Sequence, residues 1–170
     1  MTGRAARIVI LAAVSLATVL LDQATKVHIM QTMRLHESIP IIPNFLSLTY
    51  IRNPGAAFGL LASSGQMFRL IFFSLTSLFA LGLLGTIFLR LRQDDWLGHS
   101  SIAAILGGAI GNMLDRLRFG EVIDFLDFYI QNYHWPAFNV ADSAISVGVF
   151  FLILHFVFEK REPDPVAEQS

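Results

Sequence analysis

The sequence predicts an all-α membrane protein, with four transmembrane helices in a single domain that covers residues 1–170. Composition is one reason, because 54% of the residues are hydrophobic and only 15% are charged, against about 25% charged residues in soluble domains. The mean hydropathy of +0.59 agrees with this. Patterning is the other reason, since residues 70–89 form a run without charge that is long enough to cross a hydrocarbon core of about 30 Å.

Composition also excludes several kinds of function. The net charge of −1 offers no clustered basic face, so we expect no nucleic-acid partner. The absence of cysteine rules out disulfides, thiol nucleophiles and thiolate metal sites. The histidines lack metal-binding spacing, and no Gly-rich phosphate loop follows a strand. We therefore expect neither a metal nor an organic cofactor.

The first expected helix covers residues 7–29, around an apolar run at 8–21. A basic start followed by a short apolar run is also typical of a secretory signal peptide. However, no small-x-small cleavage motif follows Leu21, and the helical pattern continues to Met30. The sequence therefore favours a retained transmembrane helix.

The second expected helix covers residues 67–90 and contains the uncharged run. The connection before it, residues 30–66, includes a β-prone run at 45–51 and then an Asn-Pro-Gly turn signal at 53–55. As a turn, this motif needs no function. As part of a site, Asn53 could donate an amide hydrogen bond.

The third and fourth expected helices cover residues 97–115 and 139–158, and each reaches spanning length only with a strongly polar residue at one end. Within the third, Gly107 and Gly111 form a small-xxx-small face that lets a neighbouring helix approach closely. The segment between the two helices, residues 116–138, is too short to span and is rich in aromatic residues. We expect it to be a short helical or loop segment at the membrane surface.

An even number of spans places both termini on one face of the membrane, including a tail at 162–170 that we expect to be disordered. Asp22, Asp115 and Asp142 then all lie at the opposite face. The two faces of the membrane carry equal numbers of basic residues, counting Lys and Arg together, so the positive-inside rule does not decide which face is cytoplasmic. The N-terminus and the short loop, where that rule has most weight, mildly favour cytoplasmic termini.

Ionisable residues at membrane depth are costly, so each polar cluster carries a functional and a structural interpretation. Asp22 and Lys26 are four residues apart on one helix face, where they could form an interfacial ion pair or orient a group in a polar cavity. Asn112, Asp115 and Arg116 form a second cluster. A buried Asp115 would need a cationic partner, and the candidate arginines are Arg52, Arg69 and Arg116.

Asp142 has an ordinary interpretation as the N3 residue of the fourth helix, with Asn139 as its N-cap. The functional interpretation gains weight when Asp142 is paired with Asp124, since both lie on the same side of the membrane. Two carboxylates held close cannot both ionise cheaply, so one keeps a proton near neutral pH. Such a pair can activate water and protonate a leaving group, as amide hydrolysis without a metal requires.

Two alternative functions remain open from the residues alone. A small proton-coupled transporter or channel could use the acids as a proton relay, but they gather on one face and no inverted repeat is visible. A non-catalytic membrane scaffold would use the glycine faces and would leave the acid pair unexplained.

Several motifs stand in order between the first and the fourth expected helix. They are Asp22-Gln23 with Lys26, Arg52-Asn53 with Gly55-Ala56-Ala57-Phe58-Gly59, Gly107-Gly108-Ala109 with Gly111-Asn112 and Asp115-Arg116, and Gly120, Val122 and Asp124-Phe125 with Phe138-Asn139 and Ala141-Asp142-Ser143. Together they resemble the signal peptidase II family of membrane aspartic peptidases, without departure from the family pattern. Outside them, no family motif is found in residues 1–20, 31–44, 90–98 and 159–170.

The resemblance implies a four-helix protein of the bacterial cytoplasmic membrane, with cytoplasmic termini and an active site toward the outer face. It also implies a small extracytoplasmic β-cradle in residues 30–66. The implied activity is that of an aspartic endopeptidase that cuts prolipoproteins immediately before a cysteine carrying diacylglyceryl. The implied partners are these substrates, membrane lipids and the inhibitor globomycin, and we expect the enzyme to act as a monomer.

The resemblance also implies roles for individual residues. The catalytic aspartates of the family correspond to Asp124 and Asp142. As a hypothesis about mechanism, we expect Asn53, Asn112 and Arg116 to hold substrate carbonyls. We expect Asp22, Asp115 and Asn139 to brace the site. The complete set of expected substrate-binding or supporting residues is Asp22, Lys26, Asn53, Gly55, Gly108, Asn112, Asp115, Arg116, Asn139 and Ala141.

Overall fold

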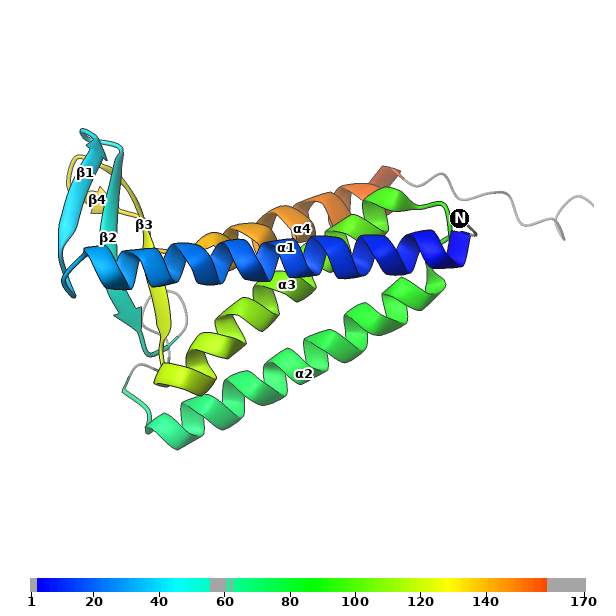
Figure 1. The fold of residues 1–170 in the computed structure, drawn as a ribbon, viewed down its shortest axis with the longest axis horizontal. Helices are drawn as coiled ribbons and strands as arrows, with labels where there is room; N and C mark the ends of the chain where they lie inside the picture. Colours follow the sequence, from blue (N-terminus) through cyan, green and yellow to red (C-terminus); the bar gives the residue numbers. More distant parts are fainter. Residues whose placement is uncertain (1–2, 56–60, 62, 159–170) are drawn as a thin grey trace, which may run out of the picture.

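Four helices and four strands make up the described part of the chain, which is residues 3–55, 61 and 63–158 of a computed structural model. The motif residues 56–59 and the expected tail at 162–170 lie outside it. The helices are α1 (Gly3–Thr32), α2 (Gln66–Arg90), α3 (Trp96–Phe119) and α4 (Val140–Phe158), and each is long and apolar enough to cross a membrane. Together with a small sheet (Figure 1), they confirm the expected fold class.

Local chemistry explains where α3 begins and ends. The side chain of Asp95 accepts a hydrogen bond of 2.8 Å from the backbone N–H of Gly98, which caps the first turn. Gly120 follows the last residue of the helix with φ of +74°, a left-handed conformation that glycine adopts without steric cost. The chain therefore leaves α3 sharply and turns toward the sheet.

α3 lies between α1 and α4, and glycines let the three helices approach closely. A Cβ atom added to Gly107 would lie 2.8 Å from the carbonyl oxygen of Ser15 on α1. A Cβ atom added to Gly148 on α4 would lie 2.8 Å from the carbonyl oxygen of Ser101 on α3. The glycine face expected from the sequence is thus a helix-packing face. α2 packs on this bundle mainly through α3, and it diverges from α1 toward the end that carries the sheet (Figure 1).

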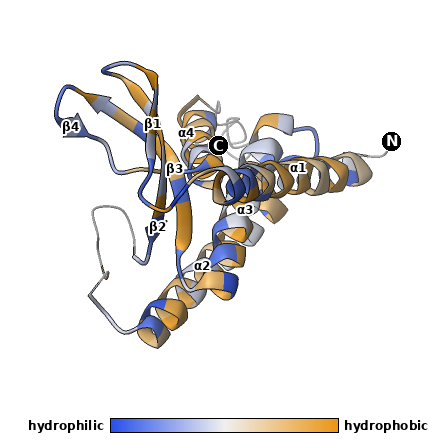
Figure 2. Ribbon diagram, turned by 60° about the vertical axis from the view of Figure 1, so that its left-hand side comes forward, coloured by the Kyte–Doolittle hydropathy of each residue, from blue (hydrophilic) through white to orange (hydrophobic). Residues whose placement is uncertain are grey.

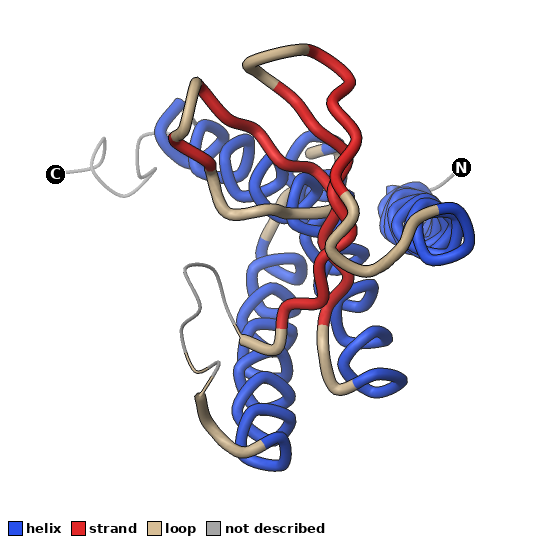
Figure 3. The backbone as a smooth tube through the Cα atoms, turned by 90° about the vertical axis from the view of Figure 1, so that its left-hand side faces the viewer, coloured by secondary structure: helices blue, strands red, loops and turns tan. Residues whose placement is uncertain are grey.

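An antiparallel sheet lies at the end of the bundle opposite to the N-terminus (Figure 1). Its strands are β1 (Ser38–Ile42), β2 (Leu46–Asn53), β3 (Val122–Ile130) and β4 (Tyr133–His134), and they neighbour one another in this order. Figure 3 views the molecule from this end and shows the strands in front of the helices. The β-prone run at 45–51 is confirmed as the strand β2.

The strand β3 was not predicted from the sequence, from which residues 116–138 were expected to be a short helical or loop segment. It pairs Asp124 with Ile51 of β2. Residues 122–125 are all buried, so this part of the strand lacks the alternation of apolar and polar residues that marks a half-buried strand. Ile123 and Phe125 form a hydrophobic core with Tyr50 of β2 and Ile29 of α1. This core fixes the sheet to the end of α1.

The helices consist largely of hydrophobic residues, as Figure 2 shows by their colour, and many large hydrophobic side chains on them are exposed. On α2, for example, Leu78 and Phe79 are strongly exposed. A lipid bilayer would cover such residues, whereas water would not favour them. The chain is therefore a multi-pass membrane protein.

Candidate active site

Asp124 and Asp142 come from different elements and line the same cavity of about 570 Å³. Successive side chains of a strand point to opposite faces, so the packing of Ile123 and Phe125 in the core directs Asp124 away from it. Asp142 lies in the first turn of α4. The structure thus places side by side, in one cavity, two acids that are separated in the chain.

Asn139 and Asp142 form a reciprocal cap at the start of α4. The side-chain oxygen of Asn139 accepts a hydrogen bond of 2.9 Å from the backbone N–H of Asp142. In return, the Asp142 carboxylate accepts one of 3.3 Å from the backbone N–H of Asn139. This is the geometry of a capping box, so the expected N-cap and N3 positions are confirmed.

Side-chain amides donate to both carboxylates. Asn139 Nδ2 lies 2.8 Å from one oxygen of Asp124, and Asn53 Nδ2 lies 3.1 Å from the other. Asn112 Nδ2 lies 2.7 Å from Asp142 Oδ1. Because each carboxylate oxygen can accept more than one hydrogen bond, the pair keeps capacity for a water molecule or a substrate.

The environment raises the pKa of Asp124 from 3.8 to about 7. Burial is the main cause, since it disfavours the charged form, and the nearby Asp142 acts in the same direction. Hydrogen bonds from Asn53 and Asn139 and the charge of Lys26 oppose the rise without cancelling it. Asp124 therefore holds its proton close to neutral pH.

Other side chains complete the wall of the cavity. Arg116 lines it, with its guanidinium carbon 4.1 Å from the ring centre of Phe73. Gly55 lines it too, and its backbone N–H donates a 3.0 Å hydrogen bond to Asn53 Oδ1, which fixes the amide of Asn53 with Nδ2 toward Asp124. The remaining lining residues are Asn53, Asn112, Val122, Trp135, Pro136, Ala137, Phe138, Ser143, Ser146 and Val147.

A buried ion cluster centred on Lys26 lies beside this cavity. Lys26 Nζ is 2.8 Å from Asp22 Oδ2 and 2.8 Å from Asp115 Oδ2, and all three side chains are at most 1% exposed. The ion pair expected between Asp22 and Lys26 is present, and it is buried among the helices with Asp115 as a second partner of Lys26. The expectation of an arginine partner for Asp115 is wrong, because Lys26 takes that place and Arg116 lies over an aromatic ring.

Gly108 and Ala141 mark the contact between α3 and the start of α4. A Cβ atom on Gly108 would overlap the carbonyl oxygen of Ala141. The backbone N–H of Ala141 donates a 2.9 Å hydrogen bond to Asp22 Oδ1. Both residues thus help to hold the turn that carries Asp142, and neither offers a side chain for chemistry.

Two features near the site were missed by sequence reasoning. Gln23 Nε2 bonds Asp115 Oδ1 at 3.0 Å and the carbonyl oxygen of Gly111 at 3.2 Å, although its position in the Asp-Gln motif could have indicated a role. His134 Nδ1 lies 2.9 Å from Asp127 Oδ1 beside a second, adjoining cavity. No spacing rule links these two residues.

Among the residues that the structure describes, no group of His, Cys, Asp and Glu side chains could hold a metal ion. The acids of the site are instead occupied by amide, ammonium and backbone N–H donors. The chemistry that this arrangement offers is acid–base catalysis by a pair of carboxylates.

This protein has four helices able to cross a membrane and, at one end of the bundle, a cavity lined by two carboxylates. These two features place it in the class of multi-pass membrane enzymes. The family pattern described as Signal peptidase (SPase) II matches residues 14–158. The chain belongs to this family and is a peptidase.

Individual relatives agree with this assignment. The chain is 53% identical over 153 residues to the lipoprotein signal peptidase of Geobacter sulfurreducens, covering 90% of this chain and 94% of the relative. It is 51% identical over 143 residues to that of Syntrophus aciditrophicus, covering 84% and 89%. A solved bacterial membrane enzyme, determined by the in meso method at 2.3 Å resolution, superposes with a TM-score of 0.78 at 34% identity, covering 91% of this chain and 93% of that one.

Proposed function

We propose that this protein removes the signal peptide from prolipoproteins, cutting immediately before a cysteine that carries diacylglyceryl. The observation that carries the proposal is the pair of aspartates in one cavity, with the pKa of Asp124 raised to about 7. The names of the relatives support the substrate class. A catalytic site at the end of apolar helices also suits a substrate whose acyl chains remain in the bilayer.

In the mechanism that we propose, Asp124 is the protonated member of the pair and polarises the scissile carbonyl. Asp142 is the ionised member, because the helix N-terminus favours a negative charge in its first turn. Asp142 takes a proton from a water molecule, whose oxygen adds to the carbonyl carbon. The carbon–nitrogen bond of the tetrahedral intermediate then breaks, and the leaving amine receives a proton from the pair.

The supporting residues divide into two groups in this proposal. Arg116 lines the cavity beside the aspartates and would bind a substrate carbonyl. Asn53 and Asn112 were expected to do the same, but their N–H groups are directed at Asp124 and Asp142. We therefore assign these two amides to orienting the carboxylates.

We also propose a location and a mode of action. The protein would lie in the bacterial cytoplasmic membrane as a monomer surrounded by lipid, with both termini in the cytoplasm. The sheet and the cavity would then face outward, where prolipoproteins arrive. A peptide inhibitor such as globomycin would compete with substrate in the same cavity.

The test is cleavage of a synthetic diacylglyceryl-modified precursor by purified protein in detergent. We expect wild type to cleave it and Asp124→Asn and Asp142→Asn to retain less than about 1% of the rate, since each variant removes one member of an acid–base pair. Normal cleavage by either variant, with normal membrane insertion, would contradict the aspartate mechanism. No cleavage by wild type would instead favour a proton-coupled transporter, which flux measurements in liposomes would detect.

A further inference from the structure

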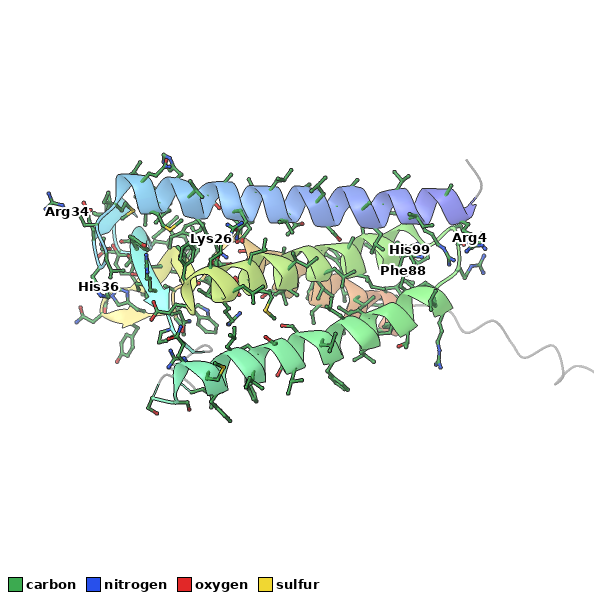
Figure 4. The ribbon with its side chains drawn as sticks, turned by 60° about the horizontal axis from the view of Figure 1, so that its bottom comes forward. Arg4, Lys26, Arg34, His36, Phe88 and His99 are labelled. Carbon is green, nitrogen blue, oxygen red and sulfur yellow. The ribbon has the colours of Figure 1, made fainter. Side chains whose placement is uncertain are left out.

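Lys26 uses all three of its N–H groups inside the protein. Its ammonium nitrogen lies 2.8 Å from Asp22 Oδ2, 2.8 Å from Asp115 Oδ2 and 3.0 Å from Asn112 Oδ1. An ammonium group has three donors, so this arrangement satisfies each of them. Figure 4 shows Lys26 directed from α1 toward the interior of the bundle, and its side chain is 1% exposed.

The Asp115 arm of this cluster reaches the strand that carries Asp124. Asp115 Oδ2, the oxygen that contacts Lys26, also accepts a 3.2 Å hydrogen bond from the backbone N–H of Ile123. Ile123 immediately precedes Asp124, so the backbone position of Ile123 helps to determine where the side chain of Asp124 lies. Lys26 therefore holds β3 in place through the carboxylate of Asp115.

The other two partners of Lys26, Asp22 and Asn112, both contact α4. Asp22 bonds Lys26 through Oδ2 and the backbone N–H of Ala141 through Oδ1, the latter at 2.9 Å. Ala141 immediately precedes Asp142, just as Ile123 precedes Asp124. Asn112 accepts from Lys26 through Oδ1, which leaves Nδ2 to donate to Asp142 at 2.7 Å.

We propose that Lys26 is a positioning residue that sets the spacing between Asp124 and Asp142, by fixing the backbone before each aspartate and the amide beside one of them. This inference rests on the proposed function. Lys26 contacts neither aspartate in this arrangement and acts through Asp22, Asp115 and Asn112.

Removing the ammonium would disturb the contacts of Asp22 and Asp115 for an electrostatic reason. Asp22 and Asp115 each lie 2.8 Å from the same nitrogen atom, so removing the ammonium leaves two buried carboxylates facing one another without an intervening cation. Their mutual repulsion would displace the oxygens that now accept hydrogen bonds from the backbone N–H groups of Ala141 and Ile123. The Asn112 amide would also lose the donor that fixes its orientation.

The test compares Lys26→Met, which removes the ammonium and keeps an unbranched apolar stem, with a matched control. Ser15→Ala removes a 2.9 Å hydrogen bond from α1 to the carbonyl oxygen of Ala103 on α3, away from the cluster. With the diacylglyceryl-modified precursor, we expect Lys26→Met to lower kcat about 100-fold with little change in KM, because misplacement by about 1 Å costs this much. We expect Ser15→Ala to keep the wild-type kcat and pH profile.

The pH profile distinguishes positioning from simple destabilisation. The charge of Lys26 lowers the pKa of Asp124, so Lys26→Met should move the alkaline limb of the kcat profile to higher pH. Lys26→Arg keeps the charge but replaces the compact ammonium by a planar fork, so it should lower kcat without moving that limb. If Lys26→Met fails to insert into the membrane, Lys26→Arg provides the test. A wild-type kcat in Lys26→Arg would overturn the proposal.

The remaining outcomes separate this inference from the proposed function. Cleavage by wild type and Ser15→Ala, with unchanged kcat and pH profile in Lys26→Met, would overturn the role of Lys26 alone. The absence of cleavage by wild type and Ser15→Ala alike would overturn the proposed function, and the inference with it.

Discussion

At the scale of single residues, Asn139 connects the two carboxylates more directly than any charge does. Its Nδ2 lies 2.8 Å from Asp124 Oδ1, 3.2 Å from the carbonyl oxygen of Ile123 and 3.1 Å from Asn112 Oδ1, so two N–H groups are shared among three acceptors. Its Oδ1 caps α4 by accepting from the backbone N–H of Asp142. A serine could provide the cap but is too short to reproduce the other contacts. The two tasks of Asn139 can therefore be separated by substitution.

We predict that Asn139→Ser and Asn139→Ala both lower cleavage at least about 10-fold, since each removes the donor to Asp124. Only Asn139→Ala should also lose the N-cap, and it should be about 1 kcal/mol less stable than Asn139→Ser. Cleavage assays and thermal unfolding in detergent measure the two effects. Equal stability of the two variants would contradict the capping role.

The raised pKa of Asp124 predicts how stability changes with pH. Its pKa is 3.8 in the unfolded reference and about 7 in the folded protein, so between these values the folded state holds a proton that the unfolded chain has released. The free energy of unfolding should therefore decrease as pH rises from about 4 to 7, by at most about 1.4 kcal/mol per pH unit. Asp124→Asn cannot titrate and lacks this contribution.

Thermal unfolding of wild type and Asp124→Asn between pH 4 and 8 measures this difference. We expect the variant to gain stability relative to wild type through this range and the gain to level off above about pH 7. A difference in stability that does not change with pH would show that the pKa of Asp124 is not raised.

At the scale of elements, the contact between α3 and α4 places Asp142. Gly108 on α3 lies so close to the carbonyl oxygen of Ala141 that a methyl group has no space. The N-terminal turn of α4 is thereby held against α3, beside Asn112. A glycine in a helix costs stability, and at this position the close approach of the two helices offsets that cost.

We predict that Gly108→Ala lowers cleavage at least about 10-fold and destabilises the protein by about 1–3 kcal/mol, because the added methyl group must push α4 away. Gly85→Ala on α2 is the matched control, since a Cβ atom there meets nothing within 4 Å. The control should keep full activity and be slightly more stable. Activity and thermal unfolding of the two variants check this prediction, and similar losses in both would contradict it.

At the scale of the whole molecule, the site exists because a sheet is fixed across the end of a helical bundle. Asp124 comes from the sheet and Asp142 from the bundle, so their distance depends on how these two parts pack. The core of Ile123, Phe125 and Tyr50 against α1 is the main apolar connection. The cavity therefore depends on the docking of the sheet as well as on its own residues.

We predict that Phe125→Ala weakens this docking, with a loss of about 3–5 kcal/mol of stability and of most cleavage activity. Phe79→Ala on α2 is the control, because Phe79 is 74% exposed on an outward face. It should retain cleavage and most of its stability in detergent. Thermal unfolding and cleavage assays distinguish the two, and equal behaviour would contradict the proposed importance of the core.

The sequence allowed the helices, the strand β2 and the N-cap at Asn139 to be predicted, because each depends on local periodicity or short spacing. The strand β3 could not be identified, since burial removes its alternation and its partner β2 lies far away in the chain. The predicted arginine partner of Asp115 was also wrong, because the partner is Lys26. Arginines outnumber lysines near the expected site, and only helix packing brings Lys26 within reach of Asp115.

By itself, the sequence determined that this protein crosses a membrane with four helices, lacks thiol chemistry and carries acids that a bilayer disfavours. The resemblance in its motifs also identified the peptidase family. The tertiary structure alone decided that Asp124 is buried beside Asp142 with a pKa near neutrality, and that Lys26 connects the elements carrying both. Burial and electrostatic interaction depend on distances between segments far apart in the chain, and local sequence patterns do not specify those distances.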